Sequence, residues 1–240
     1  MTRFRYGTQG VRGYTTGMRD LPNDGPSLLG DEDSAPFEVI NREGGAHILL
    51  VCDHASNVVP HQLGHLGLDP ETFEHHIGYA NDGIPVPGNQ NLDEPAKRQR
   101  IRDIFEPYHD AVNRALARLW NRAAAPAILS VHSFSPRFGD KPRPWDIGVL
   151  WNRDPRIAIP LMEHLERYDL RVGDNEPYSG HDLAYTIDVH GAAAGIANVA
   201  IEINQDQLGT PGEILKWVDI LSESILPILD IPGLHRVERF

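Results

Sequence analysis

The chain has 240 residues, of which 40% are hydrophobic, so it is long enough to bury the core of one large domain. Its formal net charge of −12 argues against nucleic acid and anionic membranes as partners, because both bind through basic patches. A small anionic substrate is compatible with this net charge, since its binding needs only one or two cationic side chains nearby. The single cysteine, Cys52, cannot form an internal disulfide, which fits a reducing compartment such as the cytoplasm.

The N-terminal residues differ in composition from the rest. Residues 1–35 are rich in glycine, threonine, proline, aspartate and serine and show no periodicity. We therefore expect a flexible extension over residues 1–35 and a single domain over residues 36–240. No stretch approaches the roughly 20 apolar residues of a membrane-spanning helix, and no apolar segment follows the first arginines as a signal peptide requires.

The domain is expected to begin with a short edge strand over residues 37–40 and a second strand over residues 48–52. The second stretch reads Ile-Leu-Leu-Val-Cys, which is typical of a parallel-sheet strand buried on both faces. Asp53 and His54 follow it directly. Because open α/β sheets bind ligands outside the carboxyl ends of their strands, this position predicts a functional site.

A helix over residues 101–120 is predicted next from its apolar spacing, with an interruption at Pro107. It leads into an apolar run that ends at His132, as in a β-α-β crossover. A third apolar run, over residues 198–204, carries Glu202 in its middle. A lone histidine is often structural, but glutamate is rarely buried without a reason. The remaining predicted elements are a strand over 147–151, a helix over 155–167, a strand over 170–172 and a helix over 211–229.

Six short motifs follow one another along this chain. They are VCDHASN at 51–57, PGNQ at 87–90, SVHSF at 130–134, RPW at 143–145, NEPY at 175–178 and IE at 201–202. In this order they resemble the motifs of the N-formylglutamate amidohydrolases. Each motif is weak alone, but their common order is specific, and the resemblance covers residues 37–222. It implies an α/β domain with a mostly parallel, mixed sheet flanked by helices, similar to the zinc carboxypeptidases and the aspartoacylase-like hydrolases.

The resemblance also implies a divalent metal, with zinc as the expected ion. Those related hydrolases hold their metal with a His-x-x-Glu pair and a distant histidine, which correspond by position to His54, Asn57 and His132. Asn57 is a weaker, neutral ligand, and Asp53 could substitute for it. The general base of the relatives corresponds to Glu202, and we expect ring nitrogens of His54 and His132 to lie roughly 3 to 4 Å apart, close enough to share one metal.

The implied reaction is hydrolysis of a small anionic N-acyl amino acid, with N-formylglutamate giving formate and glutamate as the first choice. Arg143 is the expected catalytic arginine, and a guanidinium fork suits a carboxylate well. A thiol nucleophile at Cys52 is less favoured, because burial raises its pKa. A non-catalytic member that binds small carboxylates is the alternative. The other residues expected at the substrate are Arg137, Asn89, Tyr178 and Ser133.

The chain departs from the family after Tyr79. There the family usually has a helix and a strand that carry arginines, whereas here Ala80 runs directly into Asn81. Either the chain has lost this segment or the segment exists and is omitted between those two residues. We favour an omitted segment, because deleting a helix and a strand would leave apolar surface uncovered. A second departure is Asn204, where the family commonly has arginine.

Overall fold

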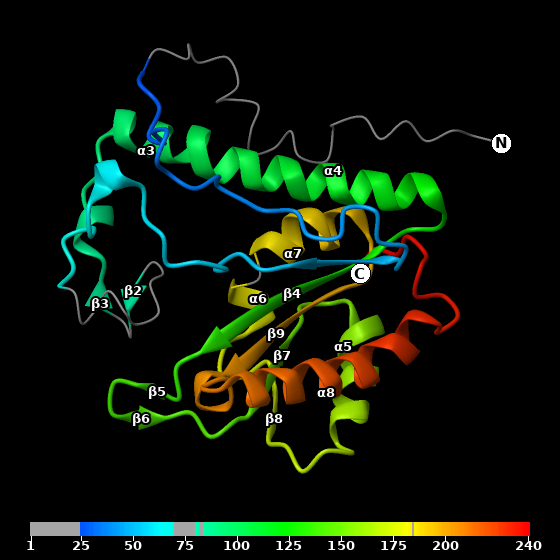
Figure 1. The fold of residues 1–240 in the computed structure, drawn as a ribbon. Helices are drawn as coiled ribbons and strands as arrows, with labels where there is room; N and C mark the ends of the chain where they lie inside the picture. The colour runs from blue at the N-terminus through cyan, green and yellow to red at the C-terminus, as the bar shows by residue number, and fades with distance from the viewer. Residues whose placement is uncertain (1–24, 70–79, 82–83, 184) are drawn as a thin grey trace.

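The computed structural model describes residues 25–69, 80–81, 84–183 and 185–240. Its central sheet contains the strands β1 (Ile48–Val51), β4 (Ala127–Phe134), β7 (Ile147–Leu150), β8 (Val172–Asp174) and β9 (Asn198–Asn204). The five strands lie in the order β1-β4-β9-β7-β8 (Figure 1). Neighbouring strands are parallel except for β7 and β9, which are antiparallel. The predicted α/β domain with a mostly parallel, mixed sheet is therefore confirmed.

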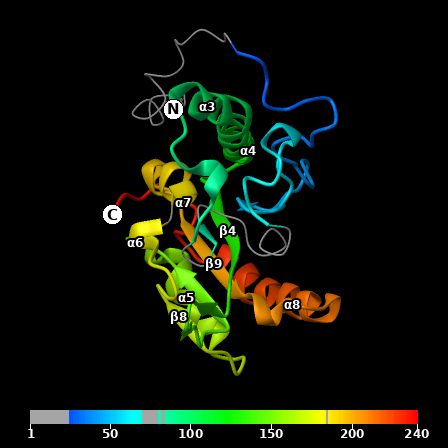
Figure 2. The ribbon, with the colours of Figure 1, turned by 90° about the vertical axis from the view of Figure 1, so that its left-hand side faces the viewer.

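Helices cover both faces of this sheet. They are α3 (Glu94–Arg100), α4 (Glu106–Arg122), α5 (Pro155–Leu165), α6 (Gly180–Leu183), α7 (Tyr185–His190) and α8 (Pro211–Leu229). Figures 1 and 2 show α4 and α7 on one face and α5 and α8 on the other. Because side chains alternate along a strand, Ile128 packs with Leu116 of α4 and Ile187 of α7, whereas Leu129 packs with Trp217 of α8.

The helix expected over residues 101–120 is present and starts earlier than predicted. It begins as α3, where the Asp93 side chain caps the helix by accepting a hydrogen bond from the Ala96 amide. It passes through a π-helical turn, η3 (Ile101–Phe105), and continues as α4. Proline cannot donate to the helical ladder, and Pro107 lies in the first turn of α4. The predicted interruption is therefore this wide turn just before Pro107.

Short elements complete the described part of the fold. No helix among the described residues has the length and apolar character needed to span a bilayer. Two small antiparallel pairs stand apart from the main sheet, and single turns of 3-10 helix connect the larger elements. They are β2 (Ala80–Asn81) with β3 (Ile84–Pro85), β5 (Arg137–Phe138) with β6 (Lys141–Pro142), η1 (His61–Leu63), η2 (Pro87–Asn89), η4 (Ala192–Ala194) and η5 (Gln205–Gln207).

Strand β1 does not have the environment expected from its sequence. In the described part of the sheet it lies at the edge, and Leu50 is 62% exposed. The expectation that residues 48–52 are buried on both faces is wrong, because an apolar run alone does not distinguish an edge strand from an interior one. Cys52 is also exposed. Loss of water around its thiol and the charge of Asp53 still raise its pKa, so it remains a poor nucleophile.

The N-terminal boundary also differs from the prediction. Residues 37–40 do not form a strand, and Ile40 is 82% exposed. Leu28, by contrast, is 1% exposed, and its amide donates a 2.6 Å hydrogen bond to Asp103 Oδ2. The packed chain therefore includes residues ahead of the expected boundary at residue 36. Residues 1–24, which form most of the expected extension, lie outside the described residues.

The omitted segment before Asn81 stays a prediction. In the sequence as given, Ala80 and Asn81 are consecutive residues of β2, which pairs with β3. Tyr79 itself lies outside the described residues. The exposed Leu50 on the edge strand is the kind of apolar surface that such a segment would cover.

Gly148 on β7 is expected to tolerate no larger side chain. A Cβ atom at this position would lie 2.1 Å from the backbone oxygen of Glu176. A backbone oxygen cannot turn aside as the end of a flexible side chain can. We therefore expect Gly148→Ala to lower the free energy of unfolding by about 3 kcal/mol, measured as a lower urea midpoint. Gly45→Ala is the control, since a Cβ at Gly45 meets no atom within 4 Å. Equal midpoints for both variants would contradict the close approach.

Candidate active site

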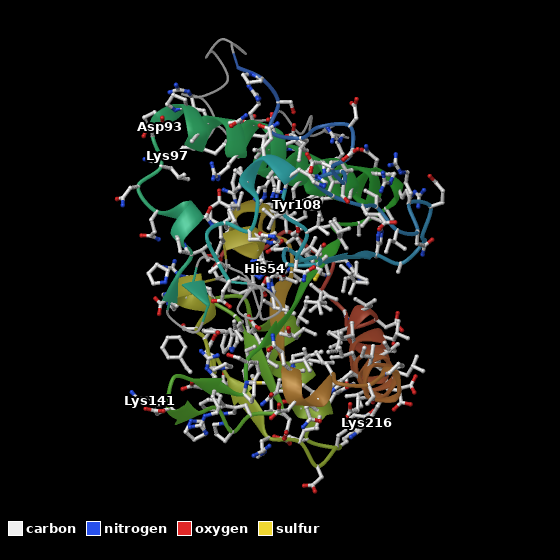
Figure 3. All side chains as sticks on the ribbon, turned by 60° about the vertical axis from the view of Figure 1, so that its left-hand side comes forward. His54, Asp93, Lys97, Tyr108, Lys141 and Lys216 are labelled. Carbon is white, nitrogen blue, oxygen red and sulfur yellow. The ribbon has the colours of Figure 1, made fainter. Side chains whose placement is uncertain are left out.

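Three neighbouring parallel strands bring ionisable residues to one place. His132 of β4 pairs with Glu202 of β9, so both side chains point to the face that α4 and α7 cover. Asp53 and His54 follow the end of β1, which pairs with β4 on the edge opposite β9. Figure 3 shows His54 near Tyr108 of α4, whereas Lys141 and Lys216 lie well away from both. The site therefore lies between the carboxyl ends of β1, β4 and β9 and helix α4.

The two histidines lie edge to face. The ring centroids of His54 and His132 are 5.2 Å apart, with an angle of 80° between the ring planes. The two rings therefore lie on the same side of the sheet, and the predicted nitrogen separation and shared metal stay a prediction. Nε2 of His132 is 2.8 Å from Ser130 Oγ and 3.5 Å from Asp53 Oδ2. Burial lowers the pKa of His132, but its bond to Asp53 and the charges of Glu202 and Asp53 raise it overall.

Asp53 is held by side chains from two helices. Tyr108 of α4 donates a short hydrogen bond to Asp53 Oδ1, and the hydroxyl of Thr186 of α7 donates a second one. Burial raises the pKa of Asp53, but the bonds from His132, Tyr108 and Thr186 outweigh it and lower the pKa to about 2. The pKa of Tyr108 is raised by burial and by the Asp53 charge. Asp53 is therefore an anion fixed by two hydroxyl donors beside His132.

Glu202 is the least solvated acid of this site. It is 8% exposed, and its Oε2 atom has no hydrogen-bond partner among the described residues. Burial raises the pKa of Glu202 to about 7, although the charges of His132 and Arg143 act in the opposite direction. A carboxyl group with this pKa can both accept and return a proton near neutral pH. Its unpartnered oxygen points to a group that is not part of the protein.

Arg143 lies beside Glu202 and is fixed by aromatic rings. Its Cζ atom is 4.8 Å from the ring centre of Tyr178 and 5.0 Å from that of Phe138. Nη1 donates to the carbonyl oxygen and the Oγ atom of Ser135, each over 3.3 Å. Both rings lie close to the guanidinium group, whose N–H fork suits a carboxylate or an oxyanion.

Four residues expected at the substrate or the metal are not brought to this cluster. Ser133 points to the opposite face of β4 from His132 and accepts a hydrogen bond from Gln205. Asn57 is exposed, and residues 54–57 are not helical, so the i, i+3 spacing does not bring it to His54. The other two are Arg137, an exposed hairpin residue that donates to the Asp140 carbonyl, and Asn89, which no described hydrogen bond links to the site.

Sequence reasoning missed the residues that surround Asp53. The apolar spacing of residues 101–120 includes Tyr108 and marks it only as a core position, and Thr186 belongs to no predicted element. Ser130 carries a usable signal, because alternation along a strand puts it on the same face as His132. Tyr108 and Thr186 carry none, since both contact Asp53 from distant parts of the sequence.

The donor types at this site fit a divalent metal. Imidazole nitrogens and a carboxylate are the ligands that zinc takes in catalytic sites. His54, His132 and Asp53 supply them, and the unpartnered Oε2 of Glu202 lies beside them. Among residues 25–69, 80–81, 84–183 and 185–240, no three His, Cys, Asp or Glu side chains already form a complete ligand set. Metal binding would therefore require these side chains to move.

Comparison with known proteins gives the family and the fold of this chain. A family model described as N-formylglutamate amidohydrolase matches residues 68–208, more than half of the chain. The solved structure of gene product Atu2144 from Agrobacterium tumefaciens is 24% identical, with a TM-score of 0.79 over 84% of this chain and 98% of its own. That of an N-formylglutamate amidohydrolase from Ralstonia eutropha JMP134 is 18% identical, with a TM-score of 0.48 over 61% of this chain and 57% of its own. None of the curated protein sequences matches this chain significantly. From the family match, this chain belongs to the N-formylglutamate amidohydrolase family and is an amidohydrolase.

Proposed function

We propose that this protein uses a divalent metal, with zinc as the expected ion, to hydrolyse the amide bond of a small N-acyl amino acid. N-formylglutamate, which would give formate and glutamate, is the first substrate to test. The observation that supports this proposal most is Glu202, a buried acid with an unpartnered oxygen and a pKa of about 7. It faces His132 across two paired strands. A zinc-carboxypeptidase-like ancestry of the fold stays a prediction.

The proposed roles follow from the chemistry of each group. Held by His54, His132 and Asp53, the metal would polarise the acyl carbonyl and make a water molecule more acidic. Glu202 accepts a proton as the water oxygen adds to the acyl carbon, and it returns that proton to the nitrogen as the C–N bond breaks. Arg143 stabilises negative charge on the substrate, either at the developing oxyanion or at the carboxylate.

The direct test is metal analysis together with product release. We expect the purified protein to carry a divalent metal and to release formate from N-formylglutamate, or carboxylic acid from other members of a panel of N-acyl amino acids. Chelation should abolish release, and added zinc should restore it. A metal-loaded protein that hydrolyses no member of the panel would overturn the proposed reaction. Full activity of the metal-free protein would show that the reaction needs no metal.

Arg143→Lys is expected to lower kcat/KM by about 10- to 100-fold. Lysine keeps the charge, but it loses the planar fork that stacks between Tyr178 and Phe138 and pairs with a carboxylate or an oxyanion. Steady-state kinetics on the best substrate of the panel measures the effect. Arg137→Lys is the matched control, because this exposed arginine of the same hairpin is expected to leave kcat/KM unchanged. Equal losses in both variants would mean that Arg143 acts only through the hairpin fold.

A further inference from the structure

Next to Asp53 lie three polar residues that the proposed reaction does not use. Nδ1 of His109, on α4, is 2.7 Å from Nε2 of His190, on α7. Nδ1 of His190 is 2.9 Å from Oδ1 of Asn113, one turn further along α4. The two imidazole rings lie edge to edge and nearly parallel, with centroids 5.0 Å apart and an angle of 19° between the ring planes. We call these three residues the histidine clasp, since they join α4 to α7.

The clasp is made of neutral imidazoles. Burial, together with the charge of His109, lowers the pKa of His190 to about 4, and burial lowers the pKa of His109 as well. A neutral imidazole has one donor and one acceptor nitrogen. His190 can therefore donate from Nδ1 to Asn113 and accept at Nε2 from His109, so that both of its ring nitrogens are used. His190 is 3% exposed, which makes each of these bonds costly to lose.

The position of the clasp in the two helices matters for Asp53. His109 directly follows Tyr108, the hydroxyl donor to Asp53 Oδ1. His190 lies one helical turn after Thr186, the second hydroxyl donor to Asp53. Each helix thus supplies one donor to the carboxylate and one histidine to the clasp. Movement of α7 relative to α4 would change the separation of the two donors and so displace Asp53.

We infer that the histidine clasp is a positioning element that holds α7 against α4 and thereby sets the orientation of Asp53. Its effect on metal binding rests on the proposed function, in which Asp53 is a ligand. Partners in the outer shell of a metal site typically change metal affinity by about 10- to 100-fold. The competing explanation is that apolar packing alone, through Val112, Leu116 and Ile187, holds the two helices together.

Two conservative changes at His190 separate these explanations. The glutamine amide extends to the position of Nε2 and can keep the bond to His109, whereas the shorter asparagine amide matches Nδ1 and keeps only the bond to Asn113. We expect His190→Asn to weaken zinc binding by about 10- to 100-fold and His190→Gln by no more than about threefold, measured by competition with a chromophoric chelator. His235→Asn is the control. His235 also bonds through both nitrogens, to the carbonyls of Ala125 and Leu229, and lies in neither helix.

A second measurement needs no metal. In the metal-free protein, amide hydrogen exchange over residues 53–57 should be faster in His190→Asn than in the wild type, and exchange in α8 should be unchanged. Asn113→Ala, which removes only the outer bond of the clasp, should show the same change to a smaller extent. It replaces His190→Asn if that variant does not fold.

Each outcome decides between the explanations. Wild-type zinc affinity and wild-type exchange over residues 53–57 in His190→Asn, or in Asn113→Ala as its replacement, would overturn the inference and leave apolar packing as the link. Equal losses in His190→Asn and His235→Asn would overturn it as well, since the effect would then be general destabilisation. If the wild type binds no zinc, the proposed metal site fails, and the exchange measurement alone decides on the clasp.

Discussion

Replacing Glu202 by glutamine is expected to lower kcat by about 10³-fold while leaving the fold intact. The amide keeps the shape of the side chain but cannot accept a proton from water, and general base catalysis commonly contributes 10²- to 10⁴-fold. In the wild type, kcat/KM should rise with pH up to about 7, as Glu202 ionises. A bound cation favours the ionised form of Glu202 and would shift this rise in kcat/KM to lower pH.

The same substitution is expected to stabilise the metal-free protein at neutral pH. Because folding raises the pKa of Glu202 from 4.5 to about 7, its favourable contribution is complete below about pH 4.5 and is lost as the pH rises through about 7. The loss amounts to about 3 kcal/mol, from roughly 1.4 kcal/mol for each unit of pKa shift. Glutamine has no such loss. Urea unfolding of both proteins at pH 5 and pH 8 should therefore show a much larger gain for Glu202→Gln at pH 8 than at pH 5.

Controls separate the base from a general effect of removing a carboxylate. Glu223→Gln changes an exposed residue of α8 that accepts a hydrogen bond from Tyr168, and it should keep full activity. Near-normal turnover in Glu202→Gln would assign the base to another residue. A variant that is inactive but no more stable at pH 8 would mean that the burial of Glu202 costs less than its raised pKa implies.

The parts of the fold that the sequence predicts well are those with a strong local pattern. Strand β9 coincides with its predicted apolar run, including the buried Glu202, and α8 coincides with the amphipathic stretch at residues 211–229. Strand β1 was predicted in place but with the wrong exposure, since whether a strand lies at an edge depends on which other strands the chain supplies.

The site was predictable in its strand-borne residues and not in its helix-borne ones. His132 and Glu202 are recognisable because each is an ionisable residue within or at the end of an apolar run that predicts a strand. Tyr108 and Thr186 approach Asp53 only because α4 and α7 pack on the same face, which no local pattern records. Between the two candidate arginines, the sequence could not show that the short β5–β6 hairpin exposes one and stacks Arg143 on Tyr178.

His132→Asn is expected to remove most of the bound metal and to lower kcat/KM by at least about 10³-fold, since a catalytic metal supplies several kcal/mol of charge stabilisation and each 1.4 kcal/mol is tenfold in rate. His132 lies between Asp53 and Glu202, so no other described side chain can replace its imidazole. Asparagine also carries no positive charge. The His132 charge lowers the pKa of Glu202. We therefore expect the residual kcat/KM of the variant to rise with pH at a higher pH than in the wild type. Elemental analysis and pH-dependent kinetics measure both effects.

Ser130→Ala provides a graded comparison on the same strand and face as His132. It removes only the oxygen that lies 2.8 Å from His132 Nε2, so we expect bound zinc to remain and its affinity to fall by no more than about tenfold. A full complement of zinc in His132→Asn would place the metal elsewhere and leave His132 as a partner of Asp53 alone. Loss of zinc with an unchanged acid limb would instead mean that Glu202 titrates independently of His132, although the two face each other across paired strands.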